Sequence, residues 1–187
     1  MKTKAIVVIA GLTAAVLALP ASAQISRGGF YLGAGVGQSD FKVNCSASPC
    51  DTKGRGFKLF AGYQFHPNVG VEVGYADLGK GTVGASNIKG NVWELDAVGS
   101  YPIARGFSVI GRAGFYNGDL TVTTPSTGAD QKATNTSWTW GIGGQADVTR
   151  NFAARIEWQA YNSMGGSSLG EKTDVNMLSV SGVWRFE

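Results

Sequence analysis

The chain has 187 residues, a formal net charge of +3, a pI near 8.9, 28 glycines and 20 aromatic residues. Its length allows one domain with a substantial core. The charge falls to +1 if Lys2 and Lys4 leave with an N-terminal signal, and no basic run occurs, which argues against nucleic-acid binding. Beyond residue 24 no apolar run is long enough for a transmembrane helix.

The N-terminus has the pattern of a secretory signal peptide. It begins M-K-T-K, continues with an uncharged apolar stretch over residues 5–19, and ends in small residues up to Ala23. An uncleaved anchor is the alternative, but the apolar stretch is short for a membrane span. We expect residues 1–23 to be removed and residues 24–187 to form one domain of 164 residues.

Short stretches of alternating polarity predict an all-β protein. The connections between the predicted strands alternate between short turns, such as H-P-N after residue 65, and long polar segments. This alternation is typical of transmembrane barrels with periplasmic turns, whereas a β-sandwich has no reason to show it. Eight strands are predicted, at residues 29–41, 55–65, 69–77, 91–101, 107–118, 136–148, 152–162 and 174–186, with long connections at 42–54, 78–90, 119–135 and 163–173.

Each predicted strand has one apolar, aromatic face and one small or polar face. Extended over all eight strands, this phase puts 15 of the 20 aromatic residues, including all five tryptophans, on the apolar face. A lipocalin-type soluble barrel would hold them inside, but an eight-stranded bore has no room for so many large side chains. The predicted fold is therefore an eight-stranded antiparallel up-and-down transmembrane β-barrel with its aromatic face toward lipid.

The stretch V-G-V-E-V-G-Y at 69–75 places the carboxylate of Glu72 in an apolar strand. The alternation of the strand directs this side chain toward the interior of the barrel. If Tyr101 pairs with Phe107, Asp96 falls opposite Arg112. If Val148 pairs with Phe152, Gln145 falls opposite Arg155. Buried charges need such partners. The predicted interior network is Lys58, Glu72, Glu94, Asp96, Arg112, Gln145, Arg155 and Glu157.

Two interpretations of this network stay open. In one, complementary charges form a structural plug that closes the bore. In the other, the ion pairs exchange partners and act as a gate for water and small ions. A conduit for hydrophobic ligands is disfavoured because the lining at mid-height is charged.

Several stretches resemble the OmpA-like transmembrane domain of Gram-negative outer membranes. They are F-Y-L-G-A-G-V-G at 30–37, A-G-Y-Q-F-H-P-N-V-G-V-E-V-G-Y-A-D-L-G at 61–79, S-Y-P-I at 100–103, R-I-E-W-Q at 155–159 and W-R-F at 184–186. The resemblance covers nearly the whole mature chain. It implies that Glu72, Arg112, Arg155 and Glu157 belong to the interior ion network that this family is thought to use as plug and gate.

The sequence departs from the family pattern at four places. Val98 stands where the family has an interior lysine, and Gln145 where a glutamate is usual. Trp184 and Phe186 resemble the terminal signal read by the outer-membrane assembly machinery, although Glu187 follows and Ser181 replaces the usual glycine. Since nothing follows the eighth strand, no peptidoglycan-binding domain is expected.

Cys45 and Cys50 lie in the first long connection, and an exported chain would oxidise them to a small-loop disulfide. The lone histidine, His66, lies in a turn without a nearby nucleophile, so no enzyme activity, metal or cofactor is expected. The resemblance implies outer-membrane lipids, lipopolysaccharide and the assembly machinery as partners. Two functions stay open: a structural protein whose loops contact host or cell-surface ligands, and a small low-conductance channel.

Overall fold

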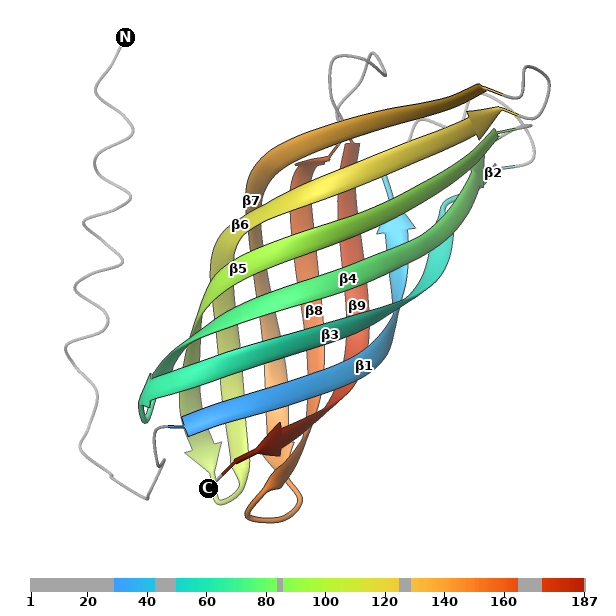
Figure 1. Cartoon of the computed structure of the whole chain (residues 1–187). Coiled ribbons are helices and arrows are strands. Elements are labelled where there is room, and N and C mark those ends of the chain that lie inside the picture. Colours follow the sequence, from blue (N-terminus) through green and yellow to red (C-terminus); the bar gives the residue numbers. More distant parts are fainter. Residues whose placement is uncertain (1–28, 43–49, 84–85, 125–128, 165–172, 187) are drawn as a thin grey trace, which may run out of the picture.

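The computed structural model describes residues 29–42, 50–83, 86–124, 129–164 and 173–186, which form eight long strands and one very short one (Figure 1). The cleavage site expected after Ala23 lies outside these residues. The strands are β1 (Gly29–Phe41), β2 (Cys50–Asp51), β3 (Lys53–His66), β4 (Val69–Val83), β5 (Ser86–Ala104), β6 (Phe107–Thr124), β7 (Ala129–Asp147), β8 (Phe152–Met164) and β9 (Thr173–Arg185).

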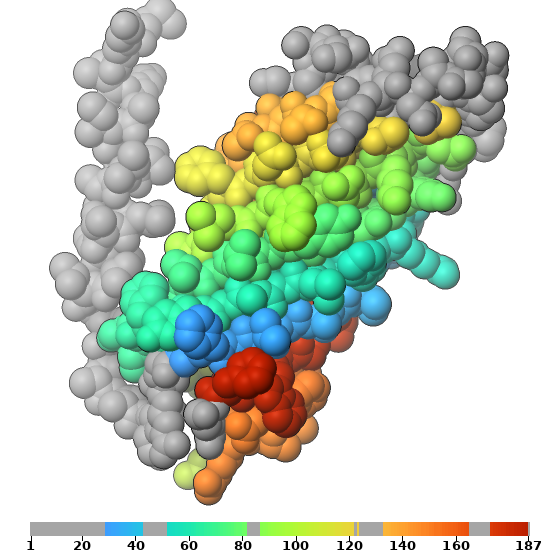
Figure 2. Space-filling view, in the orientation of Figure 1, coloured from blue at the N-terminus to red at the C-terminus, as the bar shows by residue number. Residues whose placement is uncertain are grey.

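The eight long strands form a closed antiparallel barrel, which confirms the predicted fold class. Each pairs with the next long strand along the chain, and β9 returns to pair with β1, so the sheet has no first or last strand through the middle of the molecule. The two residues of β2, which the alternation did not predict, pair with the far end of β4. Figure 2 shows β1, β3, β4 and β5 side by side on one outer face.

The two ends of the barrel differ. Three tight connections, β3–β4, β5–β6 and β7–β8, lie at one end, here called the turn end, where β1 begins and β9 finishes (Figure 1). At the opposite end, here called the loop end, β5, β6 and β7 reach well beyond their predicted limits, with 19, 18 and 19 residues. These extensions contain four threonines, which favour strands, but they are polar on much of both faces and lack the clear alternation that would have identified them.

The turn between β5 and β6 corrects one predicted register. Arg105 and Gly106 form a two-residue turn in which Gly106 has φ 77°, a conformation that favours glycine. An irregularity at Pro102 then pairs Tyr101 with Val109 rather than with Phe107. The shift is two residues, so every side chain keeps its predicted face.

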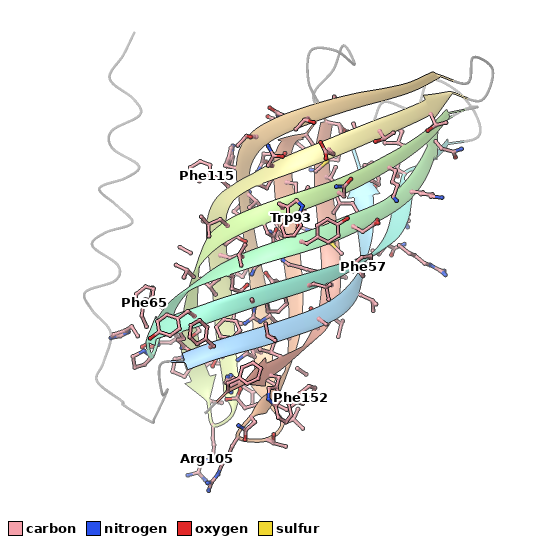
Figure 3. The ribbon with its side chains drawn as sticks, viewed as in Figure 1. Phe57, Phe65, Trp93, Arg105, Phe115 and Phe152 are labelled. Carbon is pink, nitrogen blue, oxygen red and sulfur yellow. The ribbon has the colours of Figure 1, made fainter. Side chains whose placement is uncertain are left out.

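The outer surface is apolar and carries two aromatic bands. Fifteen of the 20 aromatic side chains point outward, including the five tryptophans, as predicted; Tyr31, Phe41, Phe60, Tyr116 and Tyr161 are buried inside. Figure 3 shows Phe57, Trp93 and Phe115 in one band and Phe65 and Phe152 in a second, nearer the turns. The two bands are eight residues apart on three strands: Phe57 and Phe65 on β3, Trp93 and Tyr101 on β5, and Phe115 and Phe107 on β6.

The interior has a charged middle and an apolar layer toward the loop end. The apolar layer, which we call the apolar plug, was not predicted, because the sequence indicated an interior of small and polar residues. It was missed because Leu78, Leu120 and Met164 lie just beyond the predicted ends of their strands. The apolar plug consists of Phe41, Ala76, Leu78, Val92, Tyr116, Leu120, Tyr161, Met164, Val175 and Met177.

Candidate functional site: the charged interior

All eight residues of the predicted network point into the barrel, and they come from six strands. The seven charged side chains are at most 4% exposed, and Gln145 is half-buried near the turn end. Strand β3 contributes Lys58, β4 Glu72, β5 Glu94 and Asp96, β6 Arg112, β7 Gln145, and β8 Arg155 and Glu157.

Arg112 is the centre of this network. Its Nε lies 2.7 Å from Oε1 of Glu157, and its Nη1 lies 3.2 Å from Glu94 and 3.4 Å from Asp96. Its Nη2 pairs with Oε2 of Glu72. The predicted Asp96–Arg112 contact therefore exists, but it is diagonal: Asp96 faces Gly114 directly, because of the corrected β5–β6 register. One guanidinium thus lies within ion-pair distance of four carboxylates, and its two Nη groups donate hydrogen bonds to Glu72, Glu94 and Gln159.

Glu72, the carboxylate in the middle of an apolar strand, is received by three donors. Tyr31 donates its hydroxyl to Oε1 at 2.8 Å, and Arg155 Nη1 donates to the same oxygen at 2.7 Å. Arg112 donates to Oε2. Arg155 in turn donates from Nε to Gln145 Oε1 at 3.1 Å, and the two residues are directly opposite across β7 and β8, which confirms that predicted pairing.

A second group lies between Arg112 and the apolar plug. Lys58 Nζ lies 2.8 Å from Glu94 Oε1. Gln159 donates to Glu94 Oε2 at 2.8 Å and to Thr139 Oγ1 at 3.0 Å, and the Tyr161 hydroxyl donates to Glu94 Oε2 at 3.0 Å. Glu94 therefore has two cations, Lys58 and Arg112, at Oε1 and two neutral donors at Oε2.

Sequence reasoning missed four members of the network: Tyr31, Thr139, Gln159 and Tyr161. Gln159 and Tyr161 alternate in phase with Arg155 and Glu157 on β8, so their inward direction was readable from the sequence. Their contacts were not, because these depend on which distant strands face each other across the bore. Tyr161 on β8 and Glu94 on β5, for example, are 67 residues apart.

The charges do not balance within the network. It holds four carboxylates and three cations, and both oxygens of Asp96 lack a hydrogen-bond donor among the described residues. Asp96 has only its 3.4 Å ionic contact with Arg112. Glu157 also accepts no hydrogen bond among the described residues, but its ionic contact with Arg112 is shorter, 2.7 Å.

Two further features lie in the bore, one on each side of the charged network. On the loop side, the apolar plug lies directly against the network, since Tyr161 belongs to both. On the turn side there is a cavity of about 30 Å³, lined by Val98, Ile110 and Arg155 among others. That volume is about enough for one water molecule.

The remaining predicted positions lie at the ends of the barrel or outside the described part. Cys45 is outside it, and only the backbone of Cys50 is described, so the disulfide stays a prediction. Trp184 and Phe186 point outward at the turn end, each 50% exposed. His66 ends β3 and accepts a hydrogen bond from the Asn68 amide at 3.3 Å. The described segments contain no group of His, Cys, Asp or Glu suited to a metal ion.

The comparisons with known proteins agree with this architecture. Residues 9–186 match the family model described as the outer membrane protein beta-barrel domain. The chain belongs to this family. It is an OmpA-like barrel of the outer membrane. The segments that the structure describes include no helix with the length and hydropathy of a membrane span.

Individual sequence relatives are outer membrane proteins. Outer membrane protein A of Klebsiella pneumoniae is 32% identical over 155 residues, covering 78% of this chain and 44% of that protein. The same protein of Escherichia fergusonii is 30% identical over 169 residues, covering 84% and 48%. The chain thus spans about half the length of these relatives.

Solved structures with low sequence identity share the fold. Neisserial surface protein A has a TM-score of 0.63 at 17% identity, covering 84% of this chain and 97% of that one. The N-terminal barrel of Pseudomonas aeruginosa OprF has 0.62 at 18%, covering 86% and 100%. Ail of Yersinia pestis, solved with the heparin analogue sucrose octasulfate, has 0.59 at 19%, covering 86% and 99%.

Proposed function

We propose that this protein is a sealed outer-membrane barrel with a structural role and a role in surface interaction, rather than a conduit. One observation carries the proposal: the charged network and the apolar plug lie in series across the bore. An ion would have to separate buried pairs and then enter a layer without polar partners. Breaking a buried pair costs about 3–5 kcal/mol, and an apolar constriction opposes wetting.

The proposed orientation puts the turn end in the periplasm and the loop end outside the cell. The support is the asymmetry of the connections, since outer-membrane barrels have short periplasmic turns and longer outer loops. This orientation also agrees with the export signal predicted at residues 1–23. The lipid and lipopolysaccharide of the membrane and the assembly machinery, which would recognise Trp184 and Phe186, are the expected partners.

Surface interaction is assigned to the strand extensions at the loop end. Beyond the aromatic band, β6 and β7 continue as a ladder of polar pairs, in which Asn117 donates to Thr136 at 2.9 Å and Thr134 to Asp119 at 2.5 Å. These ordered polar strands would present their loops to host or cell-surface ligands. The complex of Ail with a heparin analogue supports this general role for a barrel of this shape. We propose no enzyme activity, because His66 lies in a turn at the opposite end.

A gated low-conductance channel is the second candidate. The observation that favours it is that Glu72 is shared between Arg112 and Arg155, on strands at different positions around the bore. A carboxylate held by two cations can exchange one for the other without becoming unpaired. Such an exchange would rearrange the network at little cost, although it would leave the apolar plug in place.

Single-channel conductance of the refolded mature barrel in a planar bilayer distinguishes the two candidates. The wild type should show no discrete openings, and Glu72→Gln should remain silent while the apolar plug is intact. Folding of each sample is checked by heat-shifted gel mobility. Discrete openings that Glu72→Gln alters would overturn the sealed-barrel proposal and establish the channel.

A further inference from the structure

We propose that Asp96 is a proton-binding site: in the folded barrel at neutral pH its carboxyl group carries a proton, and this proton makes the interior network electroneutral. An unfolded chain would release the proton, so acid stabilises the folded barrel through this one side chain. The inference goes beyond the proposed function and does not depend on whether the bore conducts.

The network contains one carboxylate more than it has cations. Its buried charged residues are Glu72, Glu94, Asp96 and Glu157, with Lys58, Arg112 and Arg155. The other three carboxylates balance the three cations, so an ionised Asp96 would be an uncompensated charge inside the barrel. A buried carboxyl group in that position becomes neutral, because the charged form costs far more free energy away from water.

Asp96 is the carboxylate with the weakest partners. Glu72 accepts hydrogen bonds from three donors, and Glu94 lies against two cations and two neutral donors. Glu157 lies 2.7 Å from Arg112 and 4.0 Å from a second cation. Among the described residues, Asp96 accepts no hydrogen bond, and its ionic contact is 3.4 Å from a nitrogen that Arg112 shares with Glu94. A proton on Asp96 therefore replaces the least interaction.

The two residues directly opposite Asp96 are not cations. Glu72 is its partner on β4, and Gly114 is its partner on β6. Like charges in a direct cross-strand pair destabilise a sheet. Glu94 adds a third carboxylate two residues away on the same face of β5. Where carboxylates share a site in this way, one of them is neutral over a wide range of pH.

The other strands complete the surroundings of Asp96. Strand β7 contributes Gly141 and Gly143, and β9 contributes Ser179 and Ser181, none of which carries a charge. The titratable side chains that the remaining strands direct into this part of the bore are Tyr31 on β1, Lys58 on β3, Arg112 on β6, and Arg155, Glu157 and Tyr161 on β8.

The space at Asp96 suits a proton rather than a metal ion. A Cβ at Gly114 would lie 2.3 Å from Asp96 Oδ1, so this oxygen lies directly against the backbone of β6. A metal ion such as Ca²⁺ or Mg²⁺ needs several oxygen ligands around it, and the described segments contain no group of side chains suited to one. The water-sized cavity at the turn end reaches β5 at Val98 and Ser100, so it stops short of Asp96.

Infrared spectroscopy tests the protonation state directly, because a protonated carboxyl group has a carbonyl stretching band that an ionised carboxylate lacks. The refolded mature barrel is measured at neutral pH in a detergent without ester groups. We expect a band equivalent to one carboxylic acid per chain. It should move to lower frequency when the side-chain carboxyl groups of all aspartates carry ¹³C, and it should be missing in Asp96→Asn.

Labelled wild-type protein keeps this test independent of whether Asp96→Asn folds. Labelling of the glutamate carboxyl groups should leave the band in place. Absence of the band from the wild type, or a band that moves with glutamate labelling instead, would overturn the proposal.

The pH dependence of stability gives an independent measurement. An aspartate of the unfolded chain is ionised above about pH 4, so above that pH the folded barrel would hold one proton more than the unfolded chain. Stability must then fall as pH rises. From about pH 5 to about pH 7, the unfolding equilibrium constant of the wild type should rise about tenfold per pH unit relative to that of Asp96→Asn.

Two controls accompany the urea titrations. Asp147→Asn, which removes an exposed carboxylate at the turn end, should keep the wild-type pH dependence. Replacement of sodium by tetramethylammonium should leave the difference between wild type and Asp96→Asn unchanged. Parallel pH curves for these two proteins, or a difference that depends on sodium, would refute the proton site. Conductance enters none of these measurements, so their failure leaves the sealed-barrel proposal unaffected.

Discussion

Arg112 on β6 and Glu157 on β8 lie 2.7 Å apart although β7 separates their strands. Their side chains meet above Gly141 and Gly143 of β7: a Cβ at Gly141 would lie 3.2 Å from Arg112 Cγ, and one at Gly143 would lie 3.1 Å from Glu157 Cγ. The bore thus has room for the long side chains of Arg112 and Glu157, because β7, the strand between theirs, has glycines without side chains at these positions. The glycines are as much a part of the network as the charges.

Removal of the central cation should destabilise the barrel strongly. Arg112→Ala leaves Asp96 without its ionic contact and Glu157 without its nearest cation in a buried environment, so we expect the free energy of unfolding to fall by about 3–5 kcal/mol. Urea titration in lipid vesicles, followed by tryptophan fluorescence and gel mobility, measures the change. Arg105→Ala, in an exposed turn, is the control and should change stability by less than about 0.5 kcal/mol. An unfolding midpoint of Arg112→Ala equal to that of the wild type would refute the role of Arg112.

Two isosteric substitutions should separate charge balance from geometry. Asp96→Asn and Glu72→Gln each reduce the network to three carboxylates and three cations. Asp96 accepts no hydrogen bond, so its substitution should leave stability unchanged or slightly raised. Glu72 accepts from three donors, so Glu72→Gln should lower stability by about 2–3 kcal/mol. Equal losses for the two variants, measured by the same urea titration, would contradict this ranking of the carboxylates.

Two glycines on β6 should respond differently to a methyl group. At Gly114 a Cβ would lie 2.1 Å from the Leu95 carbonyl oxygen and 2.3 Å from Asp96 Oδ1, whereas at Gly111 it would meet nothing within 4 Å. Gly114→Ala should therefore cost about 1–3 kcal/mol through overpacking. Gly111→Ala should be close to neutral. Unfolding midpoints of the two variants give a direct comparison on one strand, and a reversed order would show that the interior is not packed as described.

The apolar plug should behave as a core. Leu78 is fully buried, so Leu78→Ala should lower stability by about 2–5 kcal/mol through loss of contacts and creation of a cavity. Leu95, 62% exposed on the lipid-facing side, provides the control. Leu95→Ala should cost clearly less, because lipid fills the space that the side chain leaves. A similar loss for both would mean that the plug is loosely packed.

The sequence was sufficient for the strand phases and for the inward direction of the network, because a period of two residues assigns every position to one face. Gln145 and Arg155 could be paired because the β7–β8 register is uninterrupted. The Asp96–Arg112 register could not, since an irregularity at Pro102 leaves no pattern of polarity. Leu120 was missed because the polar stretch around it ended the visible alternation. Contacts across the bore, such as Arg155 on β8 with Glu72 on β4, depend on barrel closure and cannot be obtained strand by strand.

The eight-residue separation of the aromatic bands has a consequence for where the barrel is stable. Eight residues at about 3.4 Å each, tilted by about 40°, give an apolar height of about 21 Å. This is less than the hydrocarbon thickness of an average bilayer, about 30 Å. In a thick bilayer the surrounding lipid would have to compress around the barrel, at a cost for each ångström of hydrophobic mismatch. The bacterial outer membrane is thinner than average, so bilayer thickness itself, in addition to any export signal, favours that membrane over thicker ones.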